Sequence, residues 1–571
     1  MWWYIFLNRV SGNIIGWKGY GPTQKQPNTM IEIKEYIIQV IHAGLAKLEI
    51  KGNVLVEKSA NSDFGDFSSN IAMALSKTLR KNPLEIAKMI QSELTIDKNI
   101  ISDHSVTKPG FLNFRGAKSF YQKNIMEIIA AADTYGRTDT GKGKKANVEF
   151  VSANPTGPLT VGHGRQAVLG DTIANILEWH HYYVMREYYY NDAGRQMRVL
   201  GQSVAARYLD LVGQEGDFPK DGYEGDYIKT IAKEILERHG DGLSSEDKIF
   251  RTYAEKLIFT DIKNTLEIIG INHDVFSNEQ TYYNTGAIDA LVEDLRDKNL
   301  IYESEGAIWF KATALGLEKD RVYYKSSGEP TYRLPDTAYH RDKLNRNFDL
   351  IIDLFGADHA DTYPDVLAAL KALGINISPI RVLIHQFVTL LKSGEKVKMS
   401  TRKATFVTLE KLIKQVGPDV VRYFFIMRSM NSHLNFDLDL AADQSEKNPV
   451  YYLQYAHARI CNIIKNGAEK DLVVTGKFDC ALLSDEAEIS LIKVLIEFPE
   501  VMAIALINLE PQGIANYLHQ MSTEFHKFYS SCRVITDDQD LSTARLNLIT
   551  AVKIVLGNGL NVLGINAPEH M

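Results

Sequence analysis

The chain has 571 residues, of which 45% are apolar and 24% are charged, and its net charge is -7. This is the composition of a globular protein long enough for about three or four domains. Its apolar stretches are shorter than the roughly 20 residues that span a bilayer, so we expect no membrane segment. The negative net charge gives no general attraction for nucleic acid, so any RNA contact must come from local basic patches.

The three cysteines, Cys461, Cys480 and Cys532, are far apart and form no C-x-x-C pair. This spacing argues against a disulfide scaffold and against a structural zinc site. The apolar segment from Trp2 to Leu7 is too short for the core of a signal peptide. We therefore expect a protein of the reducing cytosol without a structural metal.

The N-terminal part divides at Met30. Residues 1–29 have neither helical nor strand periodicity, and we expect them to be a disordered and dispensable extension. An amphipathic helix pattern begins at Met30, and further helices are expected near residues 71–79 and 86–90. The segment from Gly110 to Phe114 alternates as a strand does. Residues 30–118 are therefore expected to form a small α+β domain.

Strand-like and helical stretches alternate in the centre of the chain. Strands are expected at residues 148–151, 182–190, 350–355 and 382–391. Such alternation is typical of a parallel, doubly wound α/β sheet. We assign residues 119–408 to this domain, with an insertion at about residues 203–330 that is rich in charge and glycine. Helical periodicity dominates after Leu409, so residues 409–571 are expected to form an all-α domain.

The densest chemical signal is VEFVSANPTGPLTVGHGRQAVLGD, residues 148–171. A strand leads through a loop with two prolines to a helix whose first turn holds Gly162, His163 and Gly164. Free backbone N–H groups at a helix start favour phosphate, and glycines let it approach closely. His163 would add a donor for charge that develops on a reacting phosphate. The alternative is that His163 only caps the helix or packs locally.

The same residues also fit a dinucleotide fingerprint. Gly162-x-Gly164-x-x-Ala167 is followed by Glu187, about 20 residues further on, where a ribose-binding acid is expected. In that fingerprint the first glycine follows the strand almost directly, whereas a long loop intervenes here. This makes a nicotinamide cofactor the weaker interpretation.

A second signal is the basic run Lys396 to Lys403, KVKMSTRK. It follows an expected strand and the turn residues Ser393 and Gly394. A basic loop of this kind can close over a polyphosphate and stabilise the transition state of its transfer. The alternative is an ordinary solvated run of charges.

Together the two signals resemble the HIGH and KMSK motifs of class I aminoacyl-tRNA synthetases, and the sequence around them resembles the arginyl family. SANPTGPLTVGHGR is similar to that family's first motif and KVKMSTRKATFVTL to its second. Similar segments follow in the same order: FGDFSSNIA at 64–72, YYNDAGRQ at 189–196, YRLPDTAYH at 332–340, GADH at 356–359 and YLQYAHARI at 452–460. The resemblance covers Met30 to Met571.

This resemblance implies a class I Rossmann-type doubly wound catalytic domain, a small α+β N-terminal domain that contacts tRNA, and an all-α C-terminal anticodon-binding domain. It implies an enzyme that uses ATP with Mg²⁺ to attach L-arginine to tRNA(Arg) through an arginyl-adenylate, releasing AMP and pyrophosphate. Enzymes similar to this one are usually monomers, so we expect a monomer.

The resemblance also assigns site residues. Catalysis would rest on Gly162, His163, Lys398, Met399 and Ser400, and ATP would be bound by Thr160, Gly162, His163, Gly164, Lys398 and Ser400. The substrate amino acid would contact Asn154, Tyr332, Asp336 and Asp358. The carboxylate of Asp336 suits the fork of donors on a guanidinium, although it could be a simple charge at a helix start. Asp358 and His359 follow a strand at its carboxyl end, where such sheets bind ligands.

Three positions depart from the family pattern. Thr160 stands at the first histidine of HIGH, Thr401 at the second lysine of KMSK, and Ala404 at a usual glycine. Loss of a phosphate donor at Thr160 could cost on the order of a hundredfold in rate. A non-catalytic RNA-binding relative therefore stays open as an alternative, as does another enzyme of the same superfamily, a different synthetase or a small-molecule nucleotidyltransferase. The long helical C-terminal part disfavours a nucleotidyltransferase.

The C-terminal part offers candidate RNA contacts. Aromatic rings and a cation at helical spacing can hold splayed bases, although aromatics at this spacing are more often core residues. The candidates, which include the chain terminus that resembles the family's, are Tyr452, Tyr455, Arg459, Phe525 and Met571, with Tyr451, His457 and Tyr529 nearby.

Overall fold

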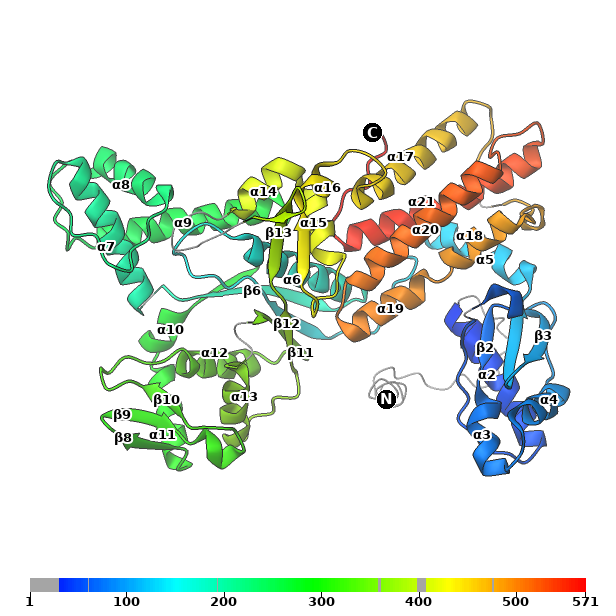
Figure 1. Cartoon of the computed structure of the whole chain (residues 1–571), viewed down its shortest axis with the longest axis horizontal. Helices are drawn as coiled ribbons and strands as arrows, with labels where there is room; N and C mark the ends of the chain where they lie inside the picture. Colours follow the sequence, from blue (N-terminus) through cyan, green and yellow to red (C-terminus); the bar gives the residue numbers. More distant parts are fainter. Residues whose placement is uncertain (1–29, 60, 193, 358–360, 398–406, 475–476) are drawn as a thin grey trace.

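The computed structural model describes residues 30–59, 61–192, 194–357, 361–397, 407–474 and 477–571. The expected extension, residues 1–29, lies outside these ranges. The molecule is elongated, with a sheet near its centre, the N-terminal domain at one end and a long bundle of helices between them (Figure 1).

The N-terminal domain packs helices against a four-stranded sheet of order β1-β2-β4-β3, in which all pairs are antiparallel. The strands are β1 (Glu57–Lys58), β2 (Phe67–Ser69), β3 (Ile101–Thr107) and β4 (Phe111–Gly116). The helices are α2 (Met30–Lys47), η1 (Ser62–Phe64), α3 (Ile71–Leu79) and α4 (Pro83–Glu93). Ile33, Ile37 and Ile41 of α2 are buried, as their helical spacing predicted. The α+β expectation is confirmed.

The central sheet is five-stranded and parallel, in the order β12-β11-β5-β6-β7. Its strands are β5 (Lys145–Glu149), β6 (Tyr183–Tyr190), β7 (Val275–Asn278), β11 (Leu350–Gly356) and β12 (Ile380–His385). Helix α6 (Val161–Trp179) packs on β5, β6 and β11. Helix α12 (Arg333–Asn345) packs on α13 (Tyr363–Ala372) and contacts the opposite face of the sheet. Neighbouring residues of a strand point to opposite faces, and in β5 Glu149 bonds Lys343 of α12 while Val148 belongs to the core around α6. The doubly wound prediction is confirmed.

The prediction of a single strand at residues 382–391 is wrong. Strand β12 ends at His385, and β13 (Val388–Lys392) belongs to a separate three-stranded sheet of order β14-β13-β15. The other strands of that sheet are β14 (Glu395–Lys396) and β15 (Leu434–Asp437), so the part expected to be wholly helical also contains a strand. The chain changes sheet at Gln386, whose N–H donates to Met430 O at 2.9 Å. Both strands are apolar runs, so periodicity could not separate them.

The single insertion expected at residues 203–330 also needs correction. Strand β7 lies inside this range and is an edge strand of the central sheet, so two separate segments are inserted. The first holds α7 (Gly194–Leu211), α8 (Asp226–His239) and α9 (Ile249–Ile268). The second holds α10 (Glu279–Asn284), α11 (Ala287–Asp297), β8 (Ile301–Ser304), β9 (Ala307–Phe310), η3 (Ala312–Leu315) and β10 (Arg321–Tyr324). Figure 1 shows them on opposite sides of the sheet's left end.

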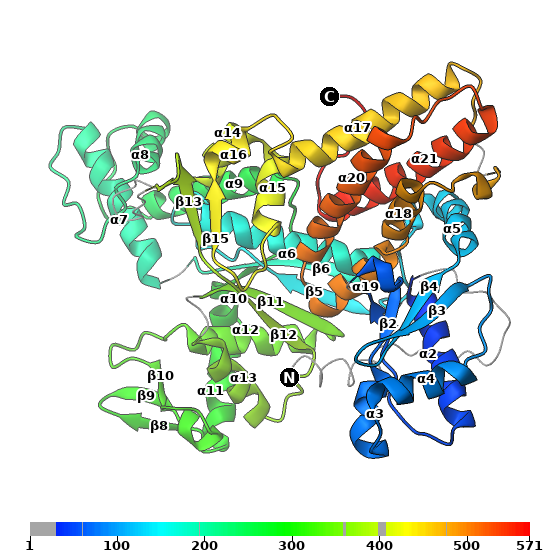
Figure 2. The same ribbon diagram turned by 45° about the vertical axis from the view of Figure 1, so that its right-hand side comes forward.

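The C-terminal part is a helical bundle, confirmed apart from β15. Its helices are α14 (Leu409–Val416), α15 (Pro418–Ile426), α16 (Leu438–Ala442), α17 (Pro449–Ala468), η5 (Cys480–Leu482), α18 (Glu486–Leu495), α19 (Phe498–Asn508), α20 (Gln512–Ser531) and α21 (Gln539–Val562). Helix α5 (Lys118–Ala131), followed by η2 (Ala132–Thr134), packs on α18 and α21, although we expected it in the α/β domain. In Figure 2 the N-terminal domain lies against this bundle, where Lys34 and Glu500 form an ion pair of 2.6 Å.

Among the described helices, none is long and apolar enough to cross a membrane. Within the described ranges, no group of three or more His, Cys, Asp and Glu side chains is placed to hold a metal ion. Cys461, Cys480 and Cys532 are free thiols.

Candidate active site

The first motif lies at the topological switch point of the central sheet. After β5 the chain passes through α6 to β6 on one side, whereas β11 pairs with β5 on the other. Open α/β sheets bind ligands in the crevice at the carboxyl ends of such strands. The loop that carries Asn154 and the start of α6 are placed at this edge.

Helix α6 begins with a capping box. Thr160 Oγ1 accepts a hydrogen bond from His163 N at 3.4 Å, and His163 Nδ1 accepts one from Thr160 N at 3.2 Å. When the ring is neutral, an accepting Nδ1 leaves the ring proton on Nε2, so the cap fixes which nitrogen can donate. The local capping role of His163 and its use as a donor are therefore compatible.

The two glycines of this turn have different surroundings. Among the described residues, the one atom that a Cβ on Gly162 would meet within 4 Å is Thr160 Oγ1, at 3.7 Å, so this backbone can be approached. A Cβ on Gly164 would lie 2.5 Å from Leu409 Cδ1 and 3.0 Å from Phe425 Cε2. Gly164 is buried and lets α6 pack against the helices behind it, so its assignment to ATP is corrected. Gly162 leaves room for a ligand to approach, whereas Gly164 leaves room for close packing of helices. The sequence alone does not distinguish these two reasons for a glycine.

The chain after the second motif is attached near the start of α6, and the chain before it is paired with β13. Thr160 forms an antiparallel bridge with Thr408, and Leu409 N donates to Leu159 O at 2.8 Å. On the other side Val397 N donates to Leu390 O of β13 at 3.0 Å. The motif residues Lys398, Met399 and Ser400, with Thr401 to Ala404, lie outside the described residues, as do Asp358 and His359.

Asn154 is held by both ends of its amide. Its Oδ1 accepts from Asn191 N at 3.0 Å, and its Nδ2 donates to Gln196 Oε1 at 2.9 Å. Tyr188 also donates its phenol to Ala153 O at 2.7 Å. These bonds fix the loop after β5 to the end of β6 and the start of α7.

Asp336 lies in the first turn of α12 and is half-buried. Tyr332, the N-cap residue, is 62% exposed, so its ring is at the surface and not packed in the core. The buried Pro335 occupies the first turn, as expected from its missing N–H. The structure thus places the two residues one turn apart at one helix start.

A second carboxylate, Glu279, lies near Asp336 and was not found from the sequence. It is the first residue of α10 and is only 4% exposed. Its Oε2 accepts from Tyr189 Oη at 3.0 Å and its Oε1 from Asn191 Nδ2 at 2.7 Å. Burial, together with the charges of Asp336 and Asp192, raises the pKa of Glu279 to about 7. A single glutamate at a helix start has no distinguishing sequence signature, so only the fold could identify it.

A buried ion cluster connects α12 to the sheet. Lys343 is fully buried and pairs with Glu149 of β5 and Asp353 of β11, and His340 Nε2 lies 3.2 Å from Asp353 Oδ2. Burial acts to lower the pKa of Lys343, but the carboxylates of Asp353 and Glu149 outweigh it and raise this pKa. The cluster fixes α12, and hence Asp336, against the carboxyl end of β5.

The dinucleotide interpretation does not fit. Glu187 is fully buried within β6, accepts from Asn147 Nδ2 at 2.6 Å and pairs with Arg346 at 3.0 Å. A carboxylate in this position is a structural partner of α12 and cannot reach a ribose.

Comparison with known proteins decides the family. A family model described as the catalytic domain of class I tRNA synthetases (R) matches residues 124–417. An arginyl tRNA synthetase N-terminal domain matches residues 32–115, and a DALR anticodon binding domain matches residues 453–571. The chain belongs to the arginyl-tRNA synthetase family. The resemblance drawn from the two motifs is thereby confirmed, as is the class I fold.

Curated relatives of this synthetase family span nearly the whole chain. An arginine–tRNA ligase of Desulfotalea psychrophila is 48% identical over 524 residues, which are 91% of this chain and 95% of the relative. The ligase of Salinibacter ruber is 49% identical over 536 residues, covering 90% and 95%. The solved arginyl-tRNA synthetase of Thermus thermophilus has the same fold, with a TM-score of 0.73 at 20% identity, covering 94% of this chain and all of that one.

The anticodon-binding domain of this synthetase carries a cation between aromatic rings. The guanidinium of Arg459 on α17 lies 4.5 Å from the ring centroid of Tyr455 and 4.9 Å from that of Tyr529. Tyr451 stacks on Tyr455 at 6.1 Å, and Tyr452 packs on His526 at 4.7 Å. Arg459, Tyr455 and Tyr452 are half-buried, so they combine fixed geometry with access from solvent.

The prediction that Phe525 contacts tRNA is corrected, because this ring is fully buried in the domain core and cannot stack on a base. Met571 is 55% exposed. The chain terminus is held near α17 by the bond between His457 Nδ1 and Pro568 O, at 2.8 Å. Of the residues predicted to contact RNA, Tyr455, Arg459 and Tyr529 therefore lie together in the structure, whereas Phe525 lies in the core.

Proposed function

We propose that this chain attaches L-arginine to tRNA(Arg) in two steps. A carboxylate oxygen of arginine attacks the α-phosphate of ATP, the bond to pyrophosphate breaks, and arginyl-adenylate forms. The terminal ribose hydroxyl of the tRNA then attacks the carbonyl carbon, loses its proton and displaces AMP. Magnesium enters as part of the nucleotide substrate. A monomeric state and a cytosolic location belong to this proposal as expectations.

The start of α6 is proposed to bind the triphosphate. Its first N–H groups and the positive end of its dipole favour an anion, and Gly162 leaves room for close approach. His163, with Nδ1 accepting from Thr160, would donate from Nε2 to the α-phosphate as charge develops. Lys398, Met399 and Ser400 keep the catalytic role that the resemblance assigns, in which Lys398 places positive charge over the leaving pyrophosphate.

The acidic pair of Asp336 and Glu279 is the observation that carries the choice of arginine. Two carboxyl groups whose charges disfavour each other, one of them buried, are suited to a guanidinium with five donors and a permanent charge. Asn154, oriented by Asn191 and Gln196, would contact the backbone end of the amino acid. Tyr332 at the helix start would cover the side chain from solvent.

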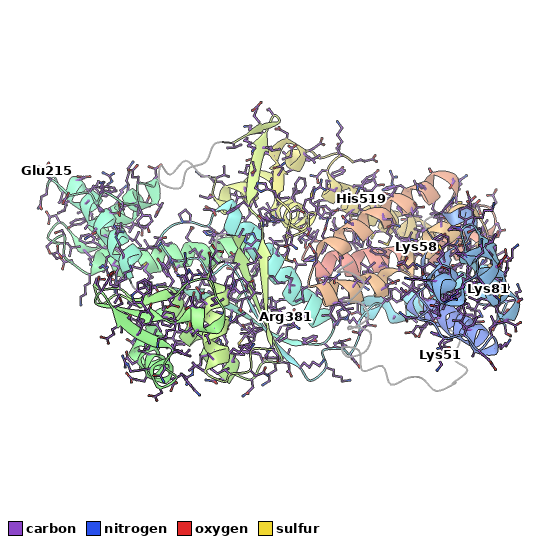
Figure 3. All side chains as sticks on the ribbon, turned by 60° about the horizontal axis from the view of Figure 1, so that its bottom comes forward. Lys51, Lys58, Lys81, Glu215, Arg381 and His519 are labelled. Atoms are coloured by element: carbon purple, nitrogen blue, oxygen red, sulfur yellow. The ribbon has the colours of Figure 1, made fainter. Side chains whose placement is uncertain are left out.

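The tRNA is proposed to contact both the helical bundle and the N-terminal domain. Arg459 and the rings of Tyr455 and Tyr452 offer stacking surfaces for splayed anticodon bases. Lys51 and Lys81 project from the N-terminal domain, at the opposite end of the molecule from Glu215 (Figure 3). Exposed lysines are suited to phosphate contacts that position RNA without reading its sequence.

Pyrophosphate exchange into ATP tests the proposal. The assay is run with each proteinogenic amino acid, with and without total tRNA, and the charged tRNA is then identified. We expect exchange with arginine alone among the amino acids, and arginine on the recovered tRNA. Exchange with another amino acid would indicate a different synthetase, and RNA binding without any exchange would indicate a non-catalytic relative.

A further inference from the structure

Arg165 is a fully buried arginine of α6 whose guanidinium is bonded to three backbone carbonyls. Its Nη1 donates to Gln386 O at 2.7 Å and to Ser432 O at 3.0 Å, and its Nη2 donates to Ser429 O at 2.9 Å. It lies two residues after His163, on the helix proposed to bind the triphosphate. No step proposed above uses it.

The three carbonyls lie at the base of the small sheet. Gln386 precedes β13, and Ser429 and Ser432 precede β15, the strand that pairs with β13 from Val388 and Leu434 onward. The segments that lead into β13 and β15 are hydrogen-bonded to each other, because Leu434 N donates to Phe387 O at 3.1 Å. One guanidinium thus fixes the start of both strands on α6. In Figures 1 and 2 these strands stand beside α15 and α16, over α6.

The small sheet carries the chain into the second motif. Strand β13 turns into β14, which ends at Lys396, directly before the described end at Val397. After the motif, Thr408 bridges Thr160. Helix α6 therefore holds the chain on both sides of the second motif, through Arg165 on one side and Thr160 on the other.

Packing alone does not explain a guanidinium at this position. Burial lowers the pKa of Arg165 to about 10, which reflects the cost of removing this charge from water. An apolar side chain would fill the space without that cost, but it could not satisfy three carbonyls from two loops. Compared with an apolar side chain, the guanidinium adds directional hydrogen bonds to these carbonyls.

We propose that Arg165 is a positioning residue for arginine activation, which sets the small sheet, up to Lys396 and Val397 where the second motif begins, at a fixed place relative to the helix start at His163. This inference rests on the proposed function. Arg165 acts through β13 and β15 and does not touch the substrates. The arginine-binding carboxylates belong to α10 and α12, which are not among its partners.

The test compares Arg165→Lys with Arg422→Lys. Arg422 is a matched control, because it is also buried and donates to two carbonyls, Leu563 O and Ile269 O, each at 2.9 Å. Like Arg165, Arg422 is attached to α6, in this case by an ion pair with Asp171. Its carbonyl partner Leu563 lies at the end of α21 and not at the small sheet. For each variant, pyrophosphate exchange gives kcat and the KM values for ATP and arginine, and thermal unfolding gives Tm.

We expect both variants to lower Tm, but only Arg165→Lys to lower kcat/KM for ATP, by roughly tenfold to a hundredfold, with the KM for arginine unchanged. Glu510→Ala is a second variant that loosens the same loop, because Glu510 Oε1 accepts from Met430 N at 3.0 Å. It should change the ATP parameters in the same direction, and it decides the question if Arg165→Lys does not fold.

Unchanged ATP parameters in Arg165→Lys or, if that variant does not fold, in Glu510→Ala would overturn the inference. Equal losses in Arg165→Lys and Arg422→Lys, in proportion to their Tm, would overturn it as well, since they would show a general effect of destabilisation. A wild-type enzyme without arginine-dependent exchange would instead refute the proposed function.

Discussion

Tyr189 donates its phenolic hydrogen to Glu279, with the two oxygens 3.0 Å apart, in a place where Glu279 is almost wholly buried and Tyr189 is half-buried. This bond stabilises the ionised carboxylate, yet burial dominates and the pKa of Glu279 is raised to about 7. The ring of Tyr189 also stacks on Tyr339 of α12, at 4.2 Å. The acid is therefore held rigidly and is half-ionised near neutrality.

The first prediction is that arginine binding weakens as pH falls below neutrality. A guanidinium binds the ionised form of Glu279, so affinity is present above the pKa and is lost below it. The KM for arginine should be about tenfold higher near pH 6 than near pH 8. Glu279→Gln should remove this dependence on pH and raise the KM at pH 8. A KM that is flat across this range in the wild-type enzyme would contradict the assignment.

The same raised pKa affects stability in the opposite direction. Between the ordinary value of 4.5 and about 7 the folded state binds the extra proton, so the unliganded enzyme loses stability through this group as pH rises. Glu279→Gln should therefore raise the Tm of the unliganded enzyme at about pH 8, where the wild-type carboxylate is ionised. Differential scanning calorimetry without arginine measures this shift, and a lower Tm in the variant would count against a destabilising charge.

The second prediction is that Asp336 determines the amino acid. Asp336→Asn keeps the size but removes the charge, and charged hydrogen bonds are stronger than neutral ones. The KM for arginine should rise by roughly tenfold or more, equivalent to about 1.4 kcal/mol. Asp342→Asn is the control, since Asp342 lies on the same helix but bonds Tyr282, at 3.3 Å. An equal rise in both variants would point to a change in α12 and not to a lost contact.

The third prediction separates the two members of the capping box. Thr160→Ala removes the helix cap and should cost about 1 kcal/mol of stability. His163→Ala should lower pyrophosphate exchange by about a hundredfold, because it also removes the proposed donor. Asn82→Ala, which removes the cap of α4 in the N-terminal domain, controls for the loss of a cap alone. If His163→Ala affects exchange no more than Thr160→Ala does, His163 is only a cap.

The fourth prediction separates core from surface in the anticodon-binding domain. Arg459→Ala should raise the KM for tRNA by about tenfold, since stacking and cation–π contacts contribute about 1–3 kcal/mol per base. Phe525→Ala should instead destabilise the fold by about 3–5 kcal/mol and leave the KM for tRNA unchanged below its Tm. Filter binding and thermal unfolding distinguish the two effects. A specific loss of tRNA binding in Phe525→Ala would show that the ring is not merely core.

Several main elements and the position of the first motif could be predicted from the sequence alone. Periodicity located α2 and the strands at β5, β6 and β11, because hydrophobic spacing reports which face of an element is buried. The helix start at Gly162 and His163 follows from local rules, since caps depend on residues within one turn. Family membership followed from the motifs in their order along the chain.

Tertiary structure decided what depends on residues far apart in sequence. Glu279 becomes a candidate for the arginine site only because α10 brings it near Asp336, and Arg165 acquires its role only where two distant loops present their carbonyls. Gly164 and Phe525 were misassigned because a residue type does not reveal what it packs against. Capping and periodicity are properties of the local chain, whereas burial and charge coupling depend on which segments the fold brings together.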